Sequence, residues 1–360
     1  MKFRILVLII FSIAFGFAQD STSFVETQIE RGNEQLNFDA AFAQIYFQEA
    51  LKVDPNNVDA LLGKGKALVI QGAYTLAAAE FNKILAIDPN NVDALIELAE
   101  AYRKLYSVDP VGLASRLPEA MNLLQRAVSI EPDNAKALNA IGIISVYNND
   151  LNGARSQLER AVSIASAESS GIAVNNVAQM HINLGVVYRE LGETQLALQS
   201  FRRAVMTNPL SASARNYVGV TYKQLDNCDQ AVYELRQAVK LNPRSLEAAS
   251  NLAISTFECG NVSESVKYFE RAIDLPGAID AAGLYTYLAR AYLEQGRLDD
   301  ALKLAQQGVL LPPVRADSFY YLGQVYEKRN NLEKAKQAYN RALELDANNQ
   351  LALTALSRLQ

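Results

Sequence analysis

The sequence is poor in the residues that carry most enzyme chemistry. It has one histidine and two cysteines, and no cluster of His, Cys and Asp has metal-ligand spacing. No glycine-rich loop lies between a predicted strand and a helix, where it could hold a phosphate. Carboxylate pairs are frequent, but they fall on predicted helix surfaces, which is typical of solvated charge. We therefore predict that the protein is not an enzyme and binds no metal or cofactor.

Two further absences restrict the fold and the partners. The chain has 34 Lys and Arg against 39 Asp and Glu, without basic runs, which argues against nucleic acid and anionic membrane surfaces. Alternating Val, Ile and Thr strands bounded by Asn-Gly turns are missing. Ala, Leu, Glu, Gln, Lys and Arg dominate instead, and these residues favour helices. The composition predicts an all-α protein.

The first residues have the pattern of a secretory signal. Lys2 and Arg4 precede the uncharged run from Ile5 to Phe17, and Gly16-Phe17-Ala18 puts small residues at the −3 and −1 positions of a cleavage site. As a helix the run would be about 20 Å long, too short for a hydrocarbon core of about 30 Å. We expect residues 1–18 to be cleaved, with an uncleaved anchor as the alternative.

No cysteine follows the apolar run, which disfavours a lipid anchor, and no later stretch has the pattern of a membrane span. The expected mature protein is therefore exported and soluble, in the periplasm or outside the cell.

One stretch sets the period of the chain. Asp54–Leu61 recurs unchanged at Asp88–Leu95, 34 residues later. Pro55 cannot continue a helix, so a helix should end before it and the next should begin shortly after it. The candidates for the cap of that next helix are Asn56, Asn57 and Asp59. A fixed period of this length is typical of stacked helical repeats.

Further copies follow in phase, and the clearest has a large residue, Leu-Gly and Tyr in its first helix, then Ala, an aromatic, Ala and Pro. These residues are His181, Leu184, Gly185, Tyr188, Ala197, Phe201, Ala204 and Pro209. The pattern resembles the tetratricopeptide repeat. Gly185 and Ala197 are small, so the two helices can approach closely there. His181 takes the large core position, so we expect a packed, hydrogen-bonded ring rather than a catalytic one.

The resemblance covers nearly all of the chain after the signal. It implies a right-handed superhelical solenoid of about nine repeats plus a C-terminal capping helix. We expect units 1–4 within 19–165, with an insertion near 107–117, and units 5–9 within 178–349. Residues 350–360 should form the cap, with its leucines, Leu353, Leu356 and Leu359, over the last core face. The small-residue stretch 166–177 is either a hinge between two rigid segments or a longer loop within one superhelix.

The two cysteines fall on neighbouring repeats. Cys228 should precede the second helix of unit 6, and Cys259 should end the first helix of unit 7. Those helices are expected to pack antiparallel, which places both cysteines on the same edge. Since export implies an oxidising compartment, we expect a Cys228–Cys259 disulfide. The alternative is a reduced pair of buried cysteines.

The resemblance also implies a binding surface. Tetratricopeptide solenoids bind ligands on a concave face lined by first helices, and the inward positions of units 5 to 9 carry amides, aliphatic residues, tyrosines and cations. The candidate binding residues are Asn183, Val186, Arg189, Asn216, Tyr217, Val220, Lys223, Asn251, Ile254, Tyr287, Arg290, Tyr320 and Tyr321. Such a surface suits an extended or helical protein segment. The alternative is that these are ordinary surface and half-buried packing residues.

The family variant that grips chaperone tails with a carboxylate clamp is not implied, because only Lys136 is basic at the first three inward positions of the repeats. We predict an exported, non-catalytic scaffold or adaptor that binds protein partners in the cell envelope or periplasm. Two alternatives stay open: a periplasmic chaperone or assembly factor for exported clients, and a non-catalytic subunit of a polysaccharide or cell-wall complex. The sequence indicates neither the partner nor whether the chain self-associates.

Overall fold

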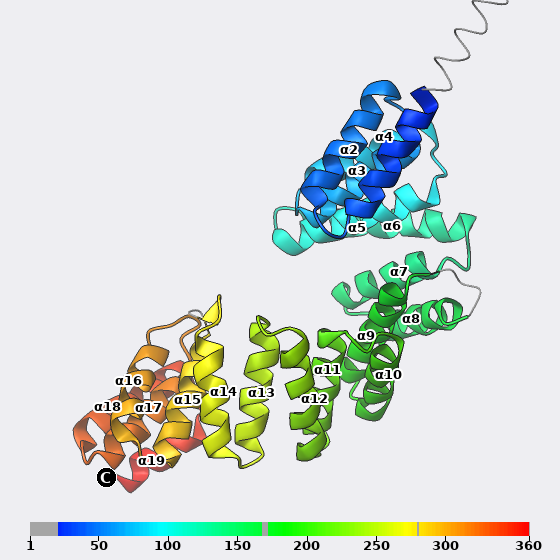
Figure 1. Ribbon diagram of the computed structural model, residues 1–360. Coiled ribbons are helices and arrows are strands. Elements are labelled where there is room, and N and C mark those ends of the chain that lie inside the picture. The colour runs from blue at the N-terminus through cyan, green and yellow to red at the C-terminus, as the bar shows by residue number, and fades with distance from the viewer. Residues whose placement is uncertain (1–20, 168–171, 279–280, 360) are drawn as a thin grey trace, which may run out of the picture. The chain divides into compact units, whose positions relative to one another are not determined.

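The computed structural model describes residues 21–167, 172–278 and 281–359, and these residues form helices and turns without a strand (Figure 1). The all-α prediction is confirmed for this part of the chain. The predicted signal peptide at 1–18 lies outside the described residues. No helix among those described is long and apolar enough to cross a membrane.

The chain divides into two compact units, one up to Ile172 and one from Ala173, which we call the N-terminal and C-terminal units. In the N-terminal unit residues 21–35 are helical. The helices that follow are α2 (Ala40–Val53), α3 (Val58–Ile70), α4 (Tyr74–Ile87), α5 (Val92–Val108), α6 (Arg116–Ile130), α7 (Ala135–Tyr147) and α8 (Leu151–Ala165).

The C-terminal unit holds the helices of the predicted units 5 to 9 and one more. They are α9 (Val174–Glu190), α10 (Thr194–Thr207), α11 (Ala212–Gln224), α12 (Cys228–Leu241), α13 (Leu246–Glu258), α14 (Val262–Ile273), α15 (Ala282–Glu294), α16 (Leu298–Gly308), α17 (Ala316–Lys328), α18 (Leu332–Leu345) and α19 (Gln350–Arg358).

Each unit is a stack of helix pairs. The first helix of a repeat packs on its second helix, as α9 packs on α10 and α11 on α12. First helices also contact the first helix of the next repeat, from α3 through α5 to α7 in one unit and from α9 to α17 in the other. The first helices of each unit therefore form one continuous layer. The layer of the C-terminal unit carries the candidate binding residues.

The repeated Asp-Pro-Asn-Asn stretch is the turn between repeats. Among the three candidate caps it is Asn57 whose Oδ1 accepts the N–H of Ala60, at 3.0 Å, and Asn91 does the same for Ala94 at 2.9 Å. Each bond satisfies one of the free N–H groups at the start of a helix. In most repeats the turn between the two helices instead has a residue with positive φ two positions before the second helix. This residue is either Gly, as at Gly72, or Asn or Asp, as at Asp226.

Glycine allows the two helices of a repeat to approach closely. A Cβ atom on Gly185 would lie 2.5 Å from a ring carbon of Phe201, which is fully buried. The equivalent Gly65 and Gly323 pack in the same way against Phe81 and Tyr339. The Leu-Gly and aromatic positions of the motif are thus the two sides of one contact, and this contact forms the core of the repeat.

The two stretches that break the period are partly helical. The first helix of unit 3, α5, has 17 residues, whereas α3 and α7 have 13, and α6 begins only at Arg116. The second stretch, 166–177, includes the first turn of α9, which also has 17 residues. Residues 168–171 lie outside the described part, so the hinge stays a prediction.

The capping helix α19 covers the last repeat with alanines rather than with the leucines that we expected. Ala352 and Ala355 are buried, whereas Leu353 is 41% exposed. Leu356 and Leu359 are half-buried and pack at the edge of the core formed by α17 and α18. The contacts of Leu356 and Leu359 with the core are therefore peripheral. The prediction that Leu353 covers the last core face was wrong.

Cys228 is the first residue of α12, and Cys259 directly follows α13. Their Cα atoms lie 5.7 Å apart and their Sγ atoms are joined. The antiparallel packing of α12 against α13 brings the start of one helix to the end of the other, as the sequence predicted for this edge of the stack.

Candidate partner-binding surface

The candidate binding residues lie on α9, α11, α13, α15 and α17, the layer of first helices in the C-terminal unit. Most are half-buried, with part of each side chain at the surface. Asn216 and Tyr320 are exceptions, at 4% and 8% exposed. Asn216 is buried against α13 of the next repeat, and the ring of Tyr320 packs against Tyr339 of its own repeat. Burial therefore corrects the assignment of these two residues to the exposed binding surface.

An aromatic stack with a cation beside it lies where α9, α10 and α11 meet. The ring of Tyr217 stacks on buried Phe201 with ring centroids 4.9 Å apart, and the guanidinium of Arg189 lies 5.7 Å from the Tyr217 centroid. Burial, with the Glu247 carboxylate nearby, raises the pKa of Tyr217. Tyr217 is therefore a neutral, rigid platform, and its exposed part is available for contact area at low entropic cost.

Amide side chains connect α11 to α13. Asn216 donates from Nδ2 to Oε1 of Glu247 at 3.0 Å, and its own Oδ1 accepts from Nδ2 of Asn251, also at 3.0 Å. Amide side chains can pair with a peptide backbone, but part of the hydrogen-bonding capacity of Asn216 and Asn251 is used between repeats. Asn251 is half-buried, and Asn183 accepts from Gln179 within α9 at 3.0 Å.

Glu258, at the end of α13, joins three helices. It forms an ion pair with Lys223 of α11, and its Oε1 accepts the hydroxyl of Tyr287 of α15 at 3.0 Å. Burial, together with this carboxylate, raises the pKa of Tyr287 to about 12. The ring of Tyr287 stacks on buried Phe269 at 5.9 Å. Sequence reasoning selected Lys223 and Tyr287 and missed Glu258, although the repeat register places Glu258 at an inward position too.

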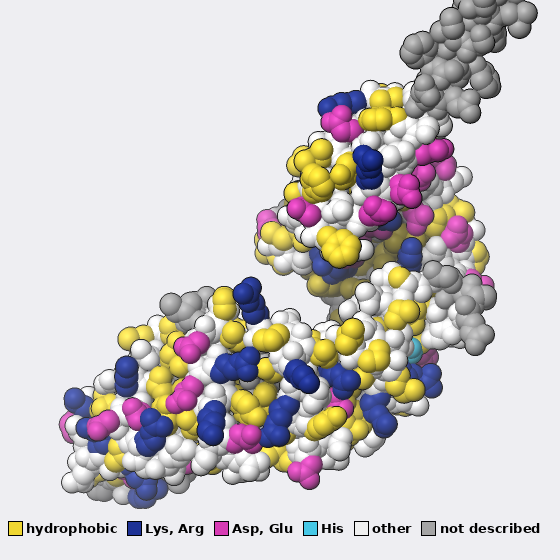
Figure 2. Space-filling model, in the orientation of Figure 1, with side chains coloured by type: hydrophobic (Ala, Val, Ile, Leu, Met, Phe, Trp, Pro, Cys, Tyr) yellow, Lys and Arg dark blue, Asp and Glu magenta, His cyan; other side chains and the backbone are white. Residues whose placement is uncertain are grey.

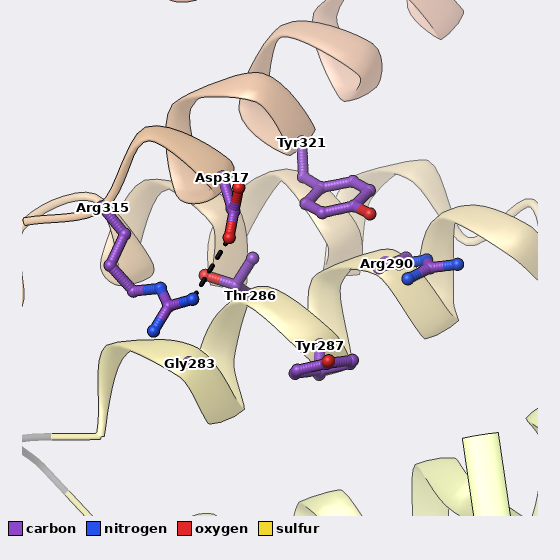
Figure 3. A pocket seen from close by; sticks show the side chains of 7 residues that line it. All are labelled: Gly283, Thr286, Tyr287, Arg290, Arg315, Asp317 and Tyr321. Atoms are coloured by element: carbon purple, nitrogen blue, oxygen red, sulfur yellow. Dashed lines mark hydrogen bonds and ion pairs between the residues drawn. The ribbon is translucent and has the colours of Figure 1, made fainter. Parts of the chain in front are cut away.

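Arg290 connects α13, α15 and α17. Its guanidinium lies 4.7 Å from the ring centroid of Phe257 and 5.4 Å from that of Tyr321. Arg290, Tyr287 and Tyr321 also line a cavity of about 160 Å³ together with Gly283, Thr286, Arg315 and Asp317 (Figure 3). This cavity opens between neighbouring first helices at the C-terminal end of the candidate surface.

The aliphatic candidates form the floor of the surface. Val220 and Ile254 are half-buried and pack against the main core of the C-terminal unit, and Val186 is half-buried on α9. One face of this unit, seen in Figure 2, carries Lys and Arg side chains among hydrophobic ones, together with some Asp and Glu. The resulting surface has fixed aromatic and aliphatic groups with cations among them.

First helices of the N-terminal unit carry ion pairs whose carboxylates were not selected from the sequence. Lys66 of α3 pairs with Glu97 of α5 at 3.5 Å, and Glu100 pairs with Arg103 within α5. Burial raises the pKa of Glu97. The same repeat register that gave the C-terminal candidates places Lys66 and Glu97 at inward positions, so the signal was present in the sequence.

His181 is buried at 3% exposure, and its Nδ1 atom has no hydrogen-bond partner among the described residues. The packed position was expected, but a hydrogen bond at this nitrogen is not found. Burial, with the Arg203 guanidinium nearby, lowers the pKa of His181. No group of His, Cys, Asp and Glu that could hold a metal ion occurs in the part of the chain that the structure covers.

Two family models described as tetratricopeptide repeat match this sequence, one at residues 37–92, 219–281 and 288–350 and the other at 178–209. These matches cover more than half of the chain. The chain belongs to the tetratricopeptide repeat family. This family assignment agrees with the helix pairs of both units and implies a scaffold with protein partners. A search of curated proteins gives no significant match.

Solved tetratricopeptide-type structures share the fold at low identity. The anaphase-promoting complex hetero-tetramer Cut9–Hcn1 matches with a TM-score of 0.61 and 20% identity over 88% of this chain, which spans 58% of that longer chain. A tetratricopeptide repeat protein from Parabacteroides merdae matches with a TM-score of 0.52 and 23% identity over 74% of this chain and 98% of that one. A human IFIT1 dimer with m7Gppp-AAAA matches with a TM-score of 0.51 and 20% identity over 86% of this chain and 78% of that one. At such identities the likeness concerns the fold alone.

Proposed function

We propose that this tetratricopeptide protein is a non-catalytic scaffold or adaptor, and that it binds a segment of a partner protein on the first helices of its C-terminal unit. The observation that carries the proposal is the row of tyrosines, aliphatic residues and cations on α9 to α17. Neighbouring helices in this row are joined by side-chain contacts, from Arg189–Tyr217 to Arg290–Tyr321. A surface fixed in this way loses little conformational entropy when a ligand binds.

The residue types suit a protein ligand. Tyr and Arg are enriched at the energetic centres of protein interfaces, and half-buried aliphatic residues such as Val186 and Val220 exclude water around them. An extended or helical segment laid across several first helices would contact all of these groups. A small molecule would contact only one or two repeats.

We infer further that the protein works in the cell envelope or periplasm. Lys2 and Arg4 followed by the apolar run to Phe17 support export. The pairing of Cys228 with Cys259 fits an oxidising compartment, where such a bond persists. Both features belong to one proposal, in which the scaffold acts after export with its disulfide formed.

Affinity capture from the native host tests the function. The bait is the full chain. The groove variant, which alters the candidate surface, combines Val186→Glu with Val220→Glu and so places two carboxylates among the aliphatic residues of that surface. The matched control is Tyr233→Glu on α12, because Tyr233 is 54% exposed on a second helix. Circular dichroism must show that all three proteins remain folded.

The proposal predicts that wild type and control recover the same partner in a fixed ratio and that the groove variant does not. Equal recovery by all three proteins would place binding elsewhere. If the bait recovers no protein at a fixed ratio but suppresses aggregation of many unfolded clients, the chaperone alternative replaces the scaffold.

A further inference from the structure

The cavity between α15 and α17 has walls of two kinds. The rings of Tyr287 and Tyr321 come from neighbouring first helices, and the guanidinium groups of Arg290 and Arg315 also come from different repeats (Figure 3). The hydroxyl of Thr286 is already satisfied, because it lies 3.0 Å from the Ala282 carbonyl oxygen and 2.7 Å from the Ser318 hydroxyl. The charged and aromatic groups that a ligand would meet are therefore the two rings, the two arginines and Asp317.

The lining of the cavity carries two arginines and one carboxylate. Arg315 donates to Asp317 at 3.1 Å, and Asp317 contributes the only carboxylate of the lining residues. Arg290 is held between the Phe257 and Tyr321 rings, and its one carboxylate contact among the described ion pairs is Glu294 at 3.4 Å. A guanidinium has five N–H donors in a fixed plane, so Arg290 retains donors for a second carboxylate.

Charge is also divided between the two units. From Ala173 onward the chain has 20 Lys and Arg and 19 Asp and Glu. The part before Ala173 has 14 Lys and Arg and 20 Asp and Glu. The whole of the acidic excess therefore belongs to the part of the sequence before Ala173. The C-terminal unit therefore presents its cations on a nearly neutral background.

The size of the cavity indicates one side chain as the occupant. Its volume of about 160 Å³ lies below the roughly 300–1,000 Å³ of sites that enclose drug-sized small molecules. A carboxylate on a short aliphatic stem fits this space, with the stem along the tyrosine rings and the oxygens towards the arginines. Partial exclusion of water by the rings strengthens such charge-assisted hydrogen bonds.

We propose that this cavity receives an Asp or Glu side chain of the partner segment and that it fixes the register of that segment on the surface. This inference rests on the proposed function, since it names one residue class in a ligand bound by the same layer of helices. The carboxylate belongs to a side chain inside the segment, not to a free chain terminus. Arg290 and Arg315 would bind it from the two sides of the α15–α17 junction.

Selection from a phage-displayed library of random twelve-residue peptides tests the proposal, because displayed peptides fused at their C-terminus have no free terminal carboxylate. The full chain, Arg290→Gln, Arg315→Gln and the control Arg244→Gln are panned in parallel. Arg244 lies in the exposed turn before α13, so its loss removes the same charge away from the cavity. Arg315 is also exposed, so Arg315→Gln tests the cavity even if Arg290→Gln disturbs the fold.

Wild type and Arg244→Gln should both select peptides with Asp or Glu at one position next to apolar residues, and the cavity variants should lose that preference. For a selected peptide, synthesised with an amidated C-terminus, Glu→Gln or Asp→Asn should weaken binding to the wild type about tenfold to a hundredfold. The same change should have little effect on binding to Arg315→Gln. Peptides with the same acidic position from all four proteins, or without any acidic preference, would overturn the cavity proposal. If no peptide is enriched on any protein, the proposed function itself fails.

Discussion

Replacement of Gly185 by alanine should destabilise the protein, although alanine is the better helix former. An added Cβ would lie 2.5, 2.6 and 2.9 Å from three ring carbons of Phe201, where normal carbon contacts are about 3.5–4.0 Å. Phe201 is fully buried and its ring is also stacked against Tyr217, so it cannot move freely. Helices α9 and α10 would have to separate by about 1 Å.

Overpacking of this kind costs about 1–3 kcal/mol, and removal of a mid-helix glycine returns at most about 1 kcal/mol. We expect a net loss of about 1–2 kcal/mol in the free energy of unfolding. Unit 7 carries Ala253 at the equivalent position, opposite Phe269, so a repeat can accommodate the methyl group when its helices are spaced for it. This limits the expected loss to the lower part of the range.

Urea unfolding followed by circular dichroism measures the effect. Gly283→Ala is the matched control, since nothing lies within 4 Å of its added Cβ, and it should be neutral or slightly stabilising. A Gly185→Ala midpoint equal to or above that of the wild type would refute the close-packing argument. If Gly283→Ala lowers the urea midpoint by as much as Gly185→Ala, the cause is a general effect of alanine and not the contact with Phe201.

Other expectations follow from single contacts. Asn91→Ala removes the acceptor for the Ala94 N–H and should cost about 1 kcal/mol; an unchanged urea midpoint would contradict the cap. Reduction of Cys228–Cys259, which are 31 residues apart, should lower stability by about 3–4 kcal/mol, and two free thiols in unreduced protein would disprove the bond. Folding lowers the pKa of His181. The stabilising contribution of the neutral ring is therefore complete above about pH 6.5, the pKa of histidine in the unfolded chain, and is lost as the pH falls below that value. Wild type should therefore lose up to about 1.4 kcal/mol per pH unit more than His181→Phe below pH 6.5, and parallel curves would contradict this.

The repeat register could be read from the sequence because its signals are local. Pro55 and Asn57 define the turn between repeats through backbone geometry and one short hydrogen bond, so they act in the same way wherever they occur. The Gly185–Phe201 contact repeats for the same reason, since a small residue and a ring at fixed positions determine how two adjacent helices pack. These features needed no knowledge of distant residues.

The candidate surface was only partly predictable, because exposure depends on the next repeat. Neighbouring positions on a helix point about 100° apart, so a small rotation decides which one is buried. Asn216 is buried against Glu247 and Asn251 of α13, while Tyr217 beside it remains half-exposed. The capping helix shows the same effect, with Ala352 inside and Leu353 outside.

Site-specific photo-crosslinking in the native host tests the central claim most directly. A photoreactive residue is placed at Asn183 on α9, within the candidate surface, or at Tyr233 on α12, on the outward face of a second helix. The account predicts that Asn183 captures one partner protein at high yield and that Tyr233 does not. Capture of that partner at Tyr233 and not at Asn183 would contradict binding on the first helices.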